Sequence, residues 1–438
     1  MKIHKNLGIR SISYFLSLTL GSLTWGTAFV TPAIAQTDAK PVTPTKPIEK
    51  TTFKDWCNDR LNLSVETWNT VYAVLKVLEA TSCEQAEQKL AVRTELNLSA
   101  SRITDLRPLK SLVNFTYLDL NRNQISDLSP LQNLTALTSL NLSFNKISDL
   151  SPLQHLTALA SLKLESNQIY DLFPLPSLTN LTELNLDINQ ITDLASLQSL
   201  VNLKKLSLAK NQITDLSSLQ ALTKLNALQL SSNRITDVSP LQSLTELTTL
   251  SAIGNRITDI SPLQNLTKLT SLHLSFNKIS DVGALENLSE LTGLSLNNNS
   301  IQDISPLSRL TKLTGLQINQ NQIQDLSPLE NSTALVSLDA SNNKVFSLNP
   351  LTNLTKLTNL NLRNNRISDI SALSGLSALN ALYLSGNVVP DLGAVSNLSN
   401  LTTVELTNSP DSIPICPFKP ESICRFGAET IESHTKVR

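Results

Sequence analysis

An asparagine recurs at 22-residue intervals through most of the chain, and this spacing constrains the fold more than any other feature. The row has thirteen members: Asn123, Asn145, Asn167, Asn189, Asn211, Asn233, Asn255, Asn277, Asn299, Asn321, Asn343, Asn365 and Asn387. One further step in each direction falls on Ser101 and Ser409, which gives fifteen units with atypical outer ones. A fixed period of this length predicts a solenoid in which each unit forms one turn.

Apolar residues keep fixed places around each asparagine. Leu137, Leu140 and Leu142 lie eight, five and three positions before Asn145, and Ile147 lies two positions after it. The L-x-L segment alternates with period two, which predicts a short strand with one buried face. Stacked turns then bury a continuous apolar column that a single turn could not bury alone. We expect the row of asparagine amides to satisfy buried backbone groups and to bind no ligand.

The opposite side of each turn carries a second recurring motif, SPL, which begins at Ser129 and at five later positions. Serine before proline is typical of a helical turn with serine as the N-cap and proline at the first position. About nine residues separate Asp127 from Leu137, too few for an α-helix and two bends. One short 3₁₀ helix fits instead. The predicted fold is therefore an α/β solenoid, a shallow horseshoe with parallel strands on its concave face and 3₁₀ turns on its convex face.

Thirteen aspartates, from Asp105 to Asp391, also occupy one position per turn, and only Ser347 breaks the series. Regularly stacked carboxylates can hold calcium, and that alternative stays open here. Each aspartate stands alone in its turn, however, without the D-x-D or glycine-rich loop of a multidentate site. We interpret them as turn carboxylates that accept hydrogen bonds from nearby backbone N–H groups.

The pattern L-x-x-L-x-L-x-x-N-x-I, from about residue 93 to residue 409, resembles the leucine-rich repeat superfamily. Its 22-residue form is similar to the internalin and phosphatase-regulator type of repeat. The internalin-like resemblance implies a scaffold that binds another protein through its concave face. The flanking sequences, FKDWC in front and CPFKPESICRF behind, resemble the caps of exported cyanobacterial leucine-rich repeat proteins.

The two ends of the chain differ from the repeats. Residues 1–35 combine basic residues, an apolar stretch and an A-x-A exit, which predicts a signal peptide cleaved after Ala35; the alternative is a retained anchor. We expect a flexible linker at 36–50, a helical cap at 51–92, the solenoid at 93–409, a second cap at 410–426 and a polar tail at 427–438. No later segment is apolar enough to span a bilayer, so the predicted product is exported, either secreted or at the periplasm or cell surface.

Within the first cap, Ser64 is expected to begin a helix whose apolar residues Trp68, Val71, Tyr72, Leu75 and Leu78 follow helical spacing. Ser82 and Gln85 are expected to form a capping box for a second short helix.

All four cysteines lie in the predicted caps. Two disulfides are expected in an exported chain, and three pairings are formally possible. Fourteen steps of about 4.8 Å between turns separate the caps by roughly 65 Å, whereas the Cα atoms of a disulfide lie within about 7 Å. The predicted pairs are therefore Cys57–Cys83 and Cys416–Cys424. Two isolated pairs offer too few ligands for a metal site.

Charge and motif content argue against several classes of function. Removal of residues 1–35 leaves 32 Lys+Arg (35 less 3) against 36 Asp+Glu, a formal net charge of −4. A weakly negative net charge does not favour binding to nucleic acid or to an anionic membrane. Three histidines follow the signal segment, His155, His273 and His434, in separate turns or in the tail. No catalytic, phosphate-binding or zinc motif is present, so we predict a protein without catalysis or cofactor.

Specificity is expected in the outward positions of the strand face, where the sequence varies. The candidate partner-binding residues form four groups: Tyr117, Asp119, Arg122 and Phe144; Lys163, Glu165, Glu183, Asp187, Lys205 and Lys210; His273 and Phe276; and Arg363 and Tyr383. Aromatic and arginine side chains dominate many interfaces, which favours the first group. Each of these residues, taken singly, is also compatible with an ordinary surface role.

The sequence thus predicts an exported, monomeric, non-enzymatic scaffold that binds a protein of unknown identity. The alternative is a structural or glycan-associated envelope protein whose Ser/Asn-rich face contacts sugar. A phosphatase regulator fits the repeat type and conflicts with the signal peptide.

Overall fold

The computed structural model describes residues 50–406, 416–418 and 421–425. The predictions for the signal peptide, for nearly all of the linker and for the polar tail lie outside these residues. Within the described ranges, no helix has both the length and the apolar character needed to cross a membrane.

Three α-helices and one 3₁₀ helix form the N-terminal cap: α1 (Phe53–Asn58), η1 (Arg60–Asn62), α2 (Val65–Val77) and α3 (Cys83–Ala91). The hydroxyls of Ser64 and Ser82 cap α2 and α3, as predicted. The expected capping box at Ser82 is wrong in one half, because the Gln85 side chain accepts from the Thr81 N–H and not from that of Ser82. The complete capping box belongs to Thr52, which begins the short α1 that the sequence did not predict.

Helix α2 attaches the cap to the first turn of the solenoid. Val71 and Val74 are fully buried, whereas Tyr72 is 57% exposed, so its predicted place on the apolar face is wrong. The buried face is displaced from the apolar pattern, because it includes the polar residues Thr67 and Thr70. The hydroxyls of Thr67 and Thr70 donate to the Asp105 carboxylate and carbonyl at 2.6 and 2.7 Å.

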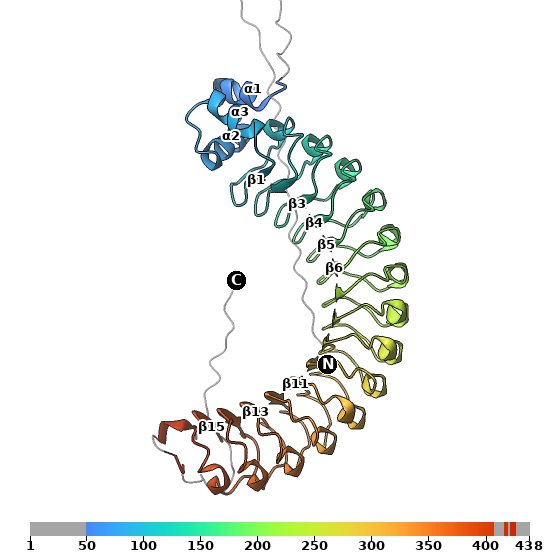
Figure 1. Ribbon diagram of the computed structural model, residues 1–438, viewed down its shortest axis with the longest axis vertical. Helices are drawn as coiled ribbons and strands as arrows, with labels where there is room; N and C mark the ends of the chain where they lie inside the picture. Colours follow the sequence, from blue (N-terminus) through green and yellow to red (C-terminus); the bar gives the residue numbers. More distant parts are fainter. Residues whose placement is uncertain (1–49, 407–415, 419–420, 426–438) are drawn as a thin grey trace, which may run out of the picture. The chain divides into compact units, whose positions relative to one another are not determined.

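A single parallel sheet runs through the described part of the chain in sequence order, β1 to β16, which confirms the predicted fold class. Its strands are β1 (Glu95–Asn97), β2 (Tyr117–Asp119), β3 (Ser139–Asn141), β4 (Ser161–Lys163), β5 (Glu183–Asn185), β6 (Lys205–Ser207), β7 (Ala227–Gln229), β8 (Thr249–Ser251), β9 (Ser271–His273), β10 (Gly293–Ser295), β11 (Gly315–Gln317), β12 (Ser337–Asp339), β13 (Asn359–Asn361), β14 (Ala381–Tyr383), β15 (Thr403–Glu405) and β16 (Cys424–Arg425). The strands line the concave side of the repeat array (Figure 1).

The register between neighbouring strands equals the sequence period, so identical positions stack. Leu118 pairs with Leu140, and Leu140 pairs with Leu162, each 22 residues apart and each buried. The first fifteen strands match the fifteen predicted units. The sequence did not predict β16, in which Cys424 of the second cap extends the sheet beside Val404.

Short 3₁₀ helices occupy the convex side, in fourteen consecutive turns: η2 (Arg107–Leu109), η3 (Ser129–Leu131), η4 (Ser151–Leu153), η5 (Leu175–Ser177), η6 (Ala195–Leu197), η7 (Ser217–Leu219), η8 (Ser239–Ser243), η9 (Ser261–Asn265), η10 (Gly283–Leu285), η11 (Ser305–Arg309), η12 (Ser327–Leu329), η13 (Asn349–Leu351), η14 (Ser371–Leu373) and η15 (Gly393–Val395). A further one, η16 (Glu421–Ile423), precedes β16.

The predicted N-cap role of the SPL serine is wrong. Ser129 is the first residue of η3, proline follows at the second position, and the capping residue is Leu128, whose side chain offers no acceptor. The Asp127 carboxylate supplies the bond instead, because its Oδ1 accepts from the Ser129 N–H at 2.8 Å. The same bond, from Oδ1 to the N–H two residues on, recurs at all thirteen aspartates of the row.

These bonds account for one carboxylate oxygen of every aspartate in the row. The Ser217 backbone N–H and hydroxyl also hold the pKa of Asp215 below its ordinary value. No group of three or more His, Cys, Asp or Glu side chains suited to a metal ion occurs in the part of the chain that the structure describes.

The asparagine row forms a ladder inside the solenoid. Asn233 donates through Nδ2 to the carbonyls of Leu208 and Leu230 at 2.9 and 3.0 Å, and its Oδ1 accepts from the Ile213 N–H at 3.1 Å. Each amide thereby joins its own turn to the preceding one, and the other twelve asparagines bond in the same way. The ladder is therefore occupied by backbone groups and offers no free amide to a ligand.

Two disulfides stabilise the caps. Cys57 in α1 bonds to Cys83 at the start of α3, and Cys416 bonds to Cys424 in β16. These are the pairs that the repeat length predicts.

Candidate interaction surface

The residue directly before each ladder asparagine lies at the rim of the strand face, and we call this set the rim column. In five successive turns it consists of Arg122, Phe144, Ser166, Ile188 and Lys210, which have φ between 54° and 57°. The conformation follows from the turn that leads into the asparagine, because the N–H of each residue bonds to a carbonyl of the next turn. Phe144 donates to Glu165 O at 2.7 Å, for example.

Left-handed backbone favours glycine and asparagine. The rim column follows this preference further along the chain, with Gly254, Asn298, Asn342, Asn364 and Gly386. Bulky side chains in this conformation carry a cost of roughly 1–2 kcal/mol each, and a β-branched residue is an outlier there.

Three bulky apolar residues nevertheless occupy the rim column and are exposed to solvent. Phe144 and Ile188 are each 37% exposed, and Phe276 is 57% exposed. Phe144 and Ile188 lie two turns apart with Ser166 between them, and the cations Arg122 and Lys210 stand at either end. The result is an apolar pair flanked by positive charge.

The first predicted group separates into two pairs. The Arg122 guanidinium lies 5.3 Å from the centroid of the Phe144 ring, and both side chains are open to solvent. Asp119 is buried and accepts from the Tyr117 hydroxyl at 3.3 Å and from the Asn121 N–H at 2.8 Å. Burial and the Asp119 charge raise the pKa of Tyr117 above its ordinary value. Arg122 and Phe144 therefore face the solvent, whereas Asp119 is engaged in hydrogen bonds within the strand face.

The mixed-charge group is partly engaged within the protein. Lys163 Nζ lies 4.0 Å from Glu183 Oε1 on the neighbouring strand. Asp187 accepts from the Ser207 hydroxyl at 2.7 Å and from the Ala209 N–H at 2.6 Å, and burial raises its pKa. Glu165 is half-buried, and Lys205 and Lys210 are exposed. Lys205 stands in register with Glu183 on the neighbouring strand, whereas Lys210 follows Ile188 in the rim column.

The two later groups differ in character. His273 lies half-buried on β9, where its Nε2 is 2.9 Å from the Ser271 hydroxyl and burial lowers its pKa. Phe276, three residues on, projects from the rim.

At the C-terminal end, the Arg363 guanidinium stacks 4.3 Å from the centroid of the Tyr383 ring. It also forms a two-pronged ion pair with Glu405, whose carboxylate accepts from the Ser385 hydroxyl at 2.6 Å. The Arg363 guanidinium lowers the pKa of Glu405 and the carboxylate raises that of Arg363. The side chains of this cluster therefore contact one another and link three neighbouring turns.

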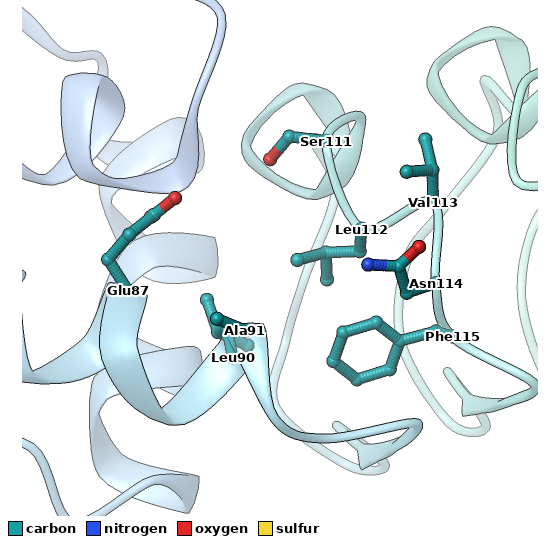
Figure 2. A pocket seen from close by; sticks show the side chains of 8 residues that line it. All are labelled: Glu87, Leu90, Ala91, Ser111, Leu112, Val113, Asn114 and Phe115. Carbon is teal, nitrogen blue, oxygen red and sulfur yellow. The ribbon is translucent and has the colours of Figure 1, made fainter.

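A pocket lies between α3 and the first turns of the solenoid. Glu87, Leu90 and Ala91 line it from α3, and residues 111–115 line it from the segment between η2 and β2 (Figure 2). Its one carboxylate, that of Glu87, accepts from the Lys54 N–H at 3.0 Å. Ser111 and Asn114 are its other polar lining residues, and no hydrogen bond joins either of them to Glu87, so the lining shows no nucleophile and base in mutual contact.

The fold and the ladder define a class of protein, the leucine-rich repeat proteins. The family model for leucine-rich repeats (two copies) matches more than half of the chain, at residues 94–133, 116–155, 201–243, 245–287, 289–331 and 333–375. The chain belongs to this family, and its similarity to solved structures makes it internalin-like. No curated protein matches the chain.

Three solved structures illustrate the similarity. An internalin of Listeria monocytogenes, InlF, is 38% identical over 71% of this chain and 93% of its own, with a TM-score of 0.69. The functional domain of InlJ from Listeria monocytogenes, which includes a cysteine ladder, is 26% identical over 82% of this chain and 81% of its own, with a TM-score of 0.66. The plant peptide hormone receptor RGFR1 in complex with RGF2 is 22% identical over 72% of this chain and 64% of its own, with a TM-score of 0.54, and shares the fold alone. The resemblance of the caps to cyanobacterial proteins stays a prediction.

Two candidate residues, Ile188 and Glu405, were not predicted from the sequence. Ile188 directly precedes a ladder asparagine, so the 22-residue period of the asparagines could have placed it in the rim column. Glu405 lies 42 residues beyond Arg363, and no sequence pattern indicates that their side chains meet.

Proposed function

We propose that this protein is an exported, non-enzymatic recognition scaffold that binds a protein partner through the N-terminal half of its concave face and rim column. The observation that carries the proposal is the stretch from Arg122 to Lys210. There, apolar side chains are exposed in a left-handed backbone that disfavours them.

Strain at such positions is a recognised mark of function. Phe144 and Ile188 could each be asparagine without disturbing the turn, because asparagine fills the same column at Asn298, Asn342 and Asn364. A residue that lowers stability and exposes apolar surface gives no benefit to the isolated fold. Both features become favourable when a partner covers the side chains, since buried aromatic and aliphatic anchors supply much of the energy of interfaces.

The charges around the apolar pair indicate the partner's chemistry. Arg122 and Lys210 flank the pair, whereas Asp119 and Asp187 are occupied by internal hydrogen bonds and Glu165 is half-buried. We infer a partner that inserts apolar side chains near Phe144 and Ile188 and presents acidic groups around them. Complementary charge of this kind also accelerates association.

Two further observations support the proposal. The cap disulfides fit an extracellular protein, because such bonds form in oxidising compartments. They weigh against an intracellular phosphatase regulator. RGFR1, which shares the fold alone with this chain, forms a complex with RGF2.

The serine-rich middle of the strand face supports the glycan alternative less well. Ser231 and Ser251 bond to each other at 2.8 Å, and Ser275 and Ser295 bond at 2.6 Å. Three of these four side chains are buried, so their hydroxyls serve neighbouring turns and are not free for sugar hydroxyls.

The test is affinity capture from envelope and extracellular extracts with residues 50–438 immobilised. The test variant is Phe144→Asn with Ile188→Asn, which keeps a residue type that the rim column already accepts. The matched control is Phe346→Ser, because Phe346 is 61% exposed and lies three residues after a ladder asparagine, where most turns carry Ser or Thr.

The proposal expects one protein to be retained by the wild type and by Phe346→Ser and lost with the double variant. Loss of two anchors should weaken binding by about a hundredfold. Equal retention by all three proteins, or retention by none, would count against it.

A further inference from the structure

A second pocket lies where helix α2 of the cap meets the first turn of the solenoid, and we call it the junction pocket. Its volume is about 370 Å³. Asn69, Tyr72, Ala73 and Lys76 line it from α2, and Ala100 and Arg102 line it from the first turn. The repeat does not reproduce this site in later turns, because much of its lining comes from α2.

The packing of α2 places three polar side chains along the pocket. Asn69, Tyr72 and Lys76 are spaced by three and four residues, so they follow one side of the helix. The hydroxyl of Thr70 holds the helix to the first turn, where it donates to the Asp105 carbonyl at 2.7 Å. Tyr72, which lies outside the buried face of α2, therefore has its ring beside the pocket.

Arg102 has a backbone conformation that its position in the repeat does not explain. Its φ is 58°, and no other described residue that directly follows a ladder position has a positive φ. The Ser101 and Ile103 N–H groups on either side both donate to Asn123 Oδ1, at 3.0 and 2.9 Å, which fixes this conformation. Left-handed backbone disfavours arginine, and strained residues of this kind cluster at binding sites.

The pocket gathers hydrogen-bond donors that the protein itself leaves unused. Within the described ranges, four of the lining side chains take part in no hydrogen bond, namely those of Asn69, Tyr72, Lys76 and Arg102. No carboxylate of the described residues lies within 4.0 Å of the two cations, and none of the lining residues is acidic. Four donors, two of them positively charged, are complementary to an anionic group.

We propose that the junction pocket binds a glutamate or aspartate side chain in an extended acidic segment of the partner protein. Lys76 and Arg102 face the carboxylate, and the Tyr72 ring with the methyl groups of Ala73 and Ala100 covers the aliphatic stem of the side chain. Inorganic phosphate fits less well, because it satisfies the two cations and leaves this apolar lining uncovered.

The position of the pocket connects it to the proposed partner-binding surface. Ala100 precedes Ser101 as each rim-column residue precedes its asparagine, so the pocket adjoins the rim column one turn before Arg122. A partner that covers Phe144 and extends toward the cap reaches the pocket with the acidic groups that Arg122 also attracts. This assignment to the partner rests on the proposed function, whereas recognition of a peptide carboxylate by the pocket does not.

The experiment is a titration followed by methyl NMR at low ionic strength. The alanine methyl groups carry ¹³C, and those of Ala73 and Ala100 report from the pocket lining. The probe is hexaglutamate with both ends blocked, and the comparison ligands are blocked hexaglutamine and inorganic phosphate.

The test variant combines Lys76→Gln with Arg102→Gln. The matched control combines Arg234→Gln with Arg256→Gln, which removes the same charge at the position that Arg102 has in its own turn, away from α2. Circular dichroism of each variant separates a loss of affinity from a loss of fold.

We expect hexaglutamate to shift the Ala73 and Ala100 signals of the wild type and the control, with an affinity about tenfold lower in the test variant. The proposal is overturned by an absence of these shifts in the wild type, by an equal loss of affinity in both variants, or by binding of hexaglutamine or phosphate as tight as that of hexaglutamate.

The titration needs no partner, so its failure is distinct from a failure of the capture experiment. Where capture retains a protein, the test variant should retain less of it than the control does. Equal retention by the two variants would remove the junction pocket from the partner-binding surface.

Discussion

Ile188 places a β-branched side chain at φ 55°, and its conformation connects the backbone of the turn to the proposed partner. The neighbouring strands and the ladder determine this backbone, so the side chain must adapt to it. Replacement by asparagine removes apolar packing but relieves the strain.

We therefore predict that Ile188→Asn leaves the free energy of unfolding unchanged or raises it by up to about 1 kcal/mol. The comparison is Val201→Asn, because Val201 is 45% exposed and has an ordinary backbone. That change should lower stability by about 0.5–1 kcal/mol. Urea denaturation of both variants checks the prediction, and an equal loss in the two would remove the strain argument.

The ladder is the second determinant at this scale. Asn233→Ala leaves the Ile213 N–H and two carbonyls without the partner that they have in the wild type. We expect a loss of about 2–4 kcal/mol in the free energy of unfolding. Asn331 is exposed and lies outside the ladder, so Asn331→Ala should change stability by less than about 0.5 kcal/mol. Similar losses for the two variants would contradict a structural ladder.

The roles of the repeating residues could be predicted from the sequence more reliably than the roles of the non-repeating residues. The asparagine row follows from its period, because one structural requirement recurs in every turn. The pairing of Arg363 with Glu405 spans two turns and depends on where individual side chains reach, which periodicity does not contain. Phe144 is exposed and Asp119 is buried and hydrogen-bonded within the protein, and only the contacts in the structure distinguish these two roles.

At the scale of elements, the short 3₁₀ helices obey rules different from those of α-helices. The SPL motif suggested serine as the cap, whereas the aspartate two residues before it accepts the N–H bond in every turn of the row. The Ser-Pro rule describes α-helices, and it fails here because a three-residue helix begins at the serine itself. Helix α1 was missed because six residues carry too little periodicity.

The last strands provide a pH-dependent prediction. Arg363 lowers the pKa of Glu405, so its folded pKa lies below the unfolded value of about 4.3. The resulting stability is present above the unfolded pKa and is lost as pH falls through the folded pKa. Glu405→Gln should lower the free energy of unfolding at pH 7 by about 1–3 kcal/mol. The variant should also lose less stability than the wild type as the pH falls below about 5.

Urea denaturation at pH 7 and near pH 3 measures this dependence. The control is Glu290→Gln, whose pair with Lys312 is solvent-exposed and should contribute little at either pH. A Glu405→Gln variant with the acid sensitivity of the wild type would exclude the ion pair as its source.

For the whole molecule, stability depends on contacts between adjacent turns and on the caps that cover the terminal ones. The 22-residue period predicted a single parallel sheet, because each turn pairs only with the turns directly before and after it and does so in register. The sequence did not predict β16, because the second cap follows no repeat and its strand contains only two residues.

Removal of the Cys57–Cys83 disulfide by replacement with serine should destabilise the N-terminal cap by about 3 kcal/mol, because the bond closes a segment of 26 residues. Hydrogen exchange should then accelerate first in β1 and β2 and last near β8. The Cys416–Cys424 bond closes only 8 residues, so its removal should cost less and act at the opposite end. Uniform acceleration along the sheet would contradict cap-limited opening.

The most direct test of the proposed function is site-specific photo-crosslinking within one turn of the solenoid. Ser139 lies on the concave face in β3, and Ser129 lies on the convex side in η3, so a benzoylphenylalanine at each position samples opposite sides of the same turn. In extracts that contain the partner, the account predicts one protein adduct from position 139 and none from position 129. Equal adducts from both positions, or an adduct from position 129 alone, would contradict recognition through the concave face.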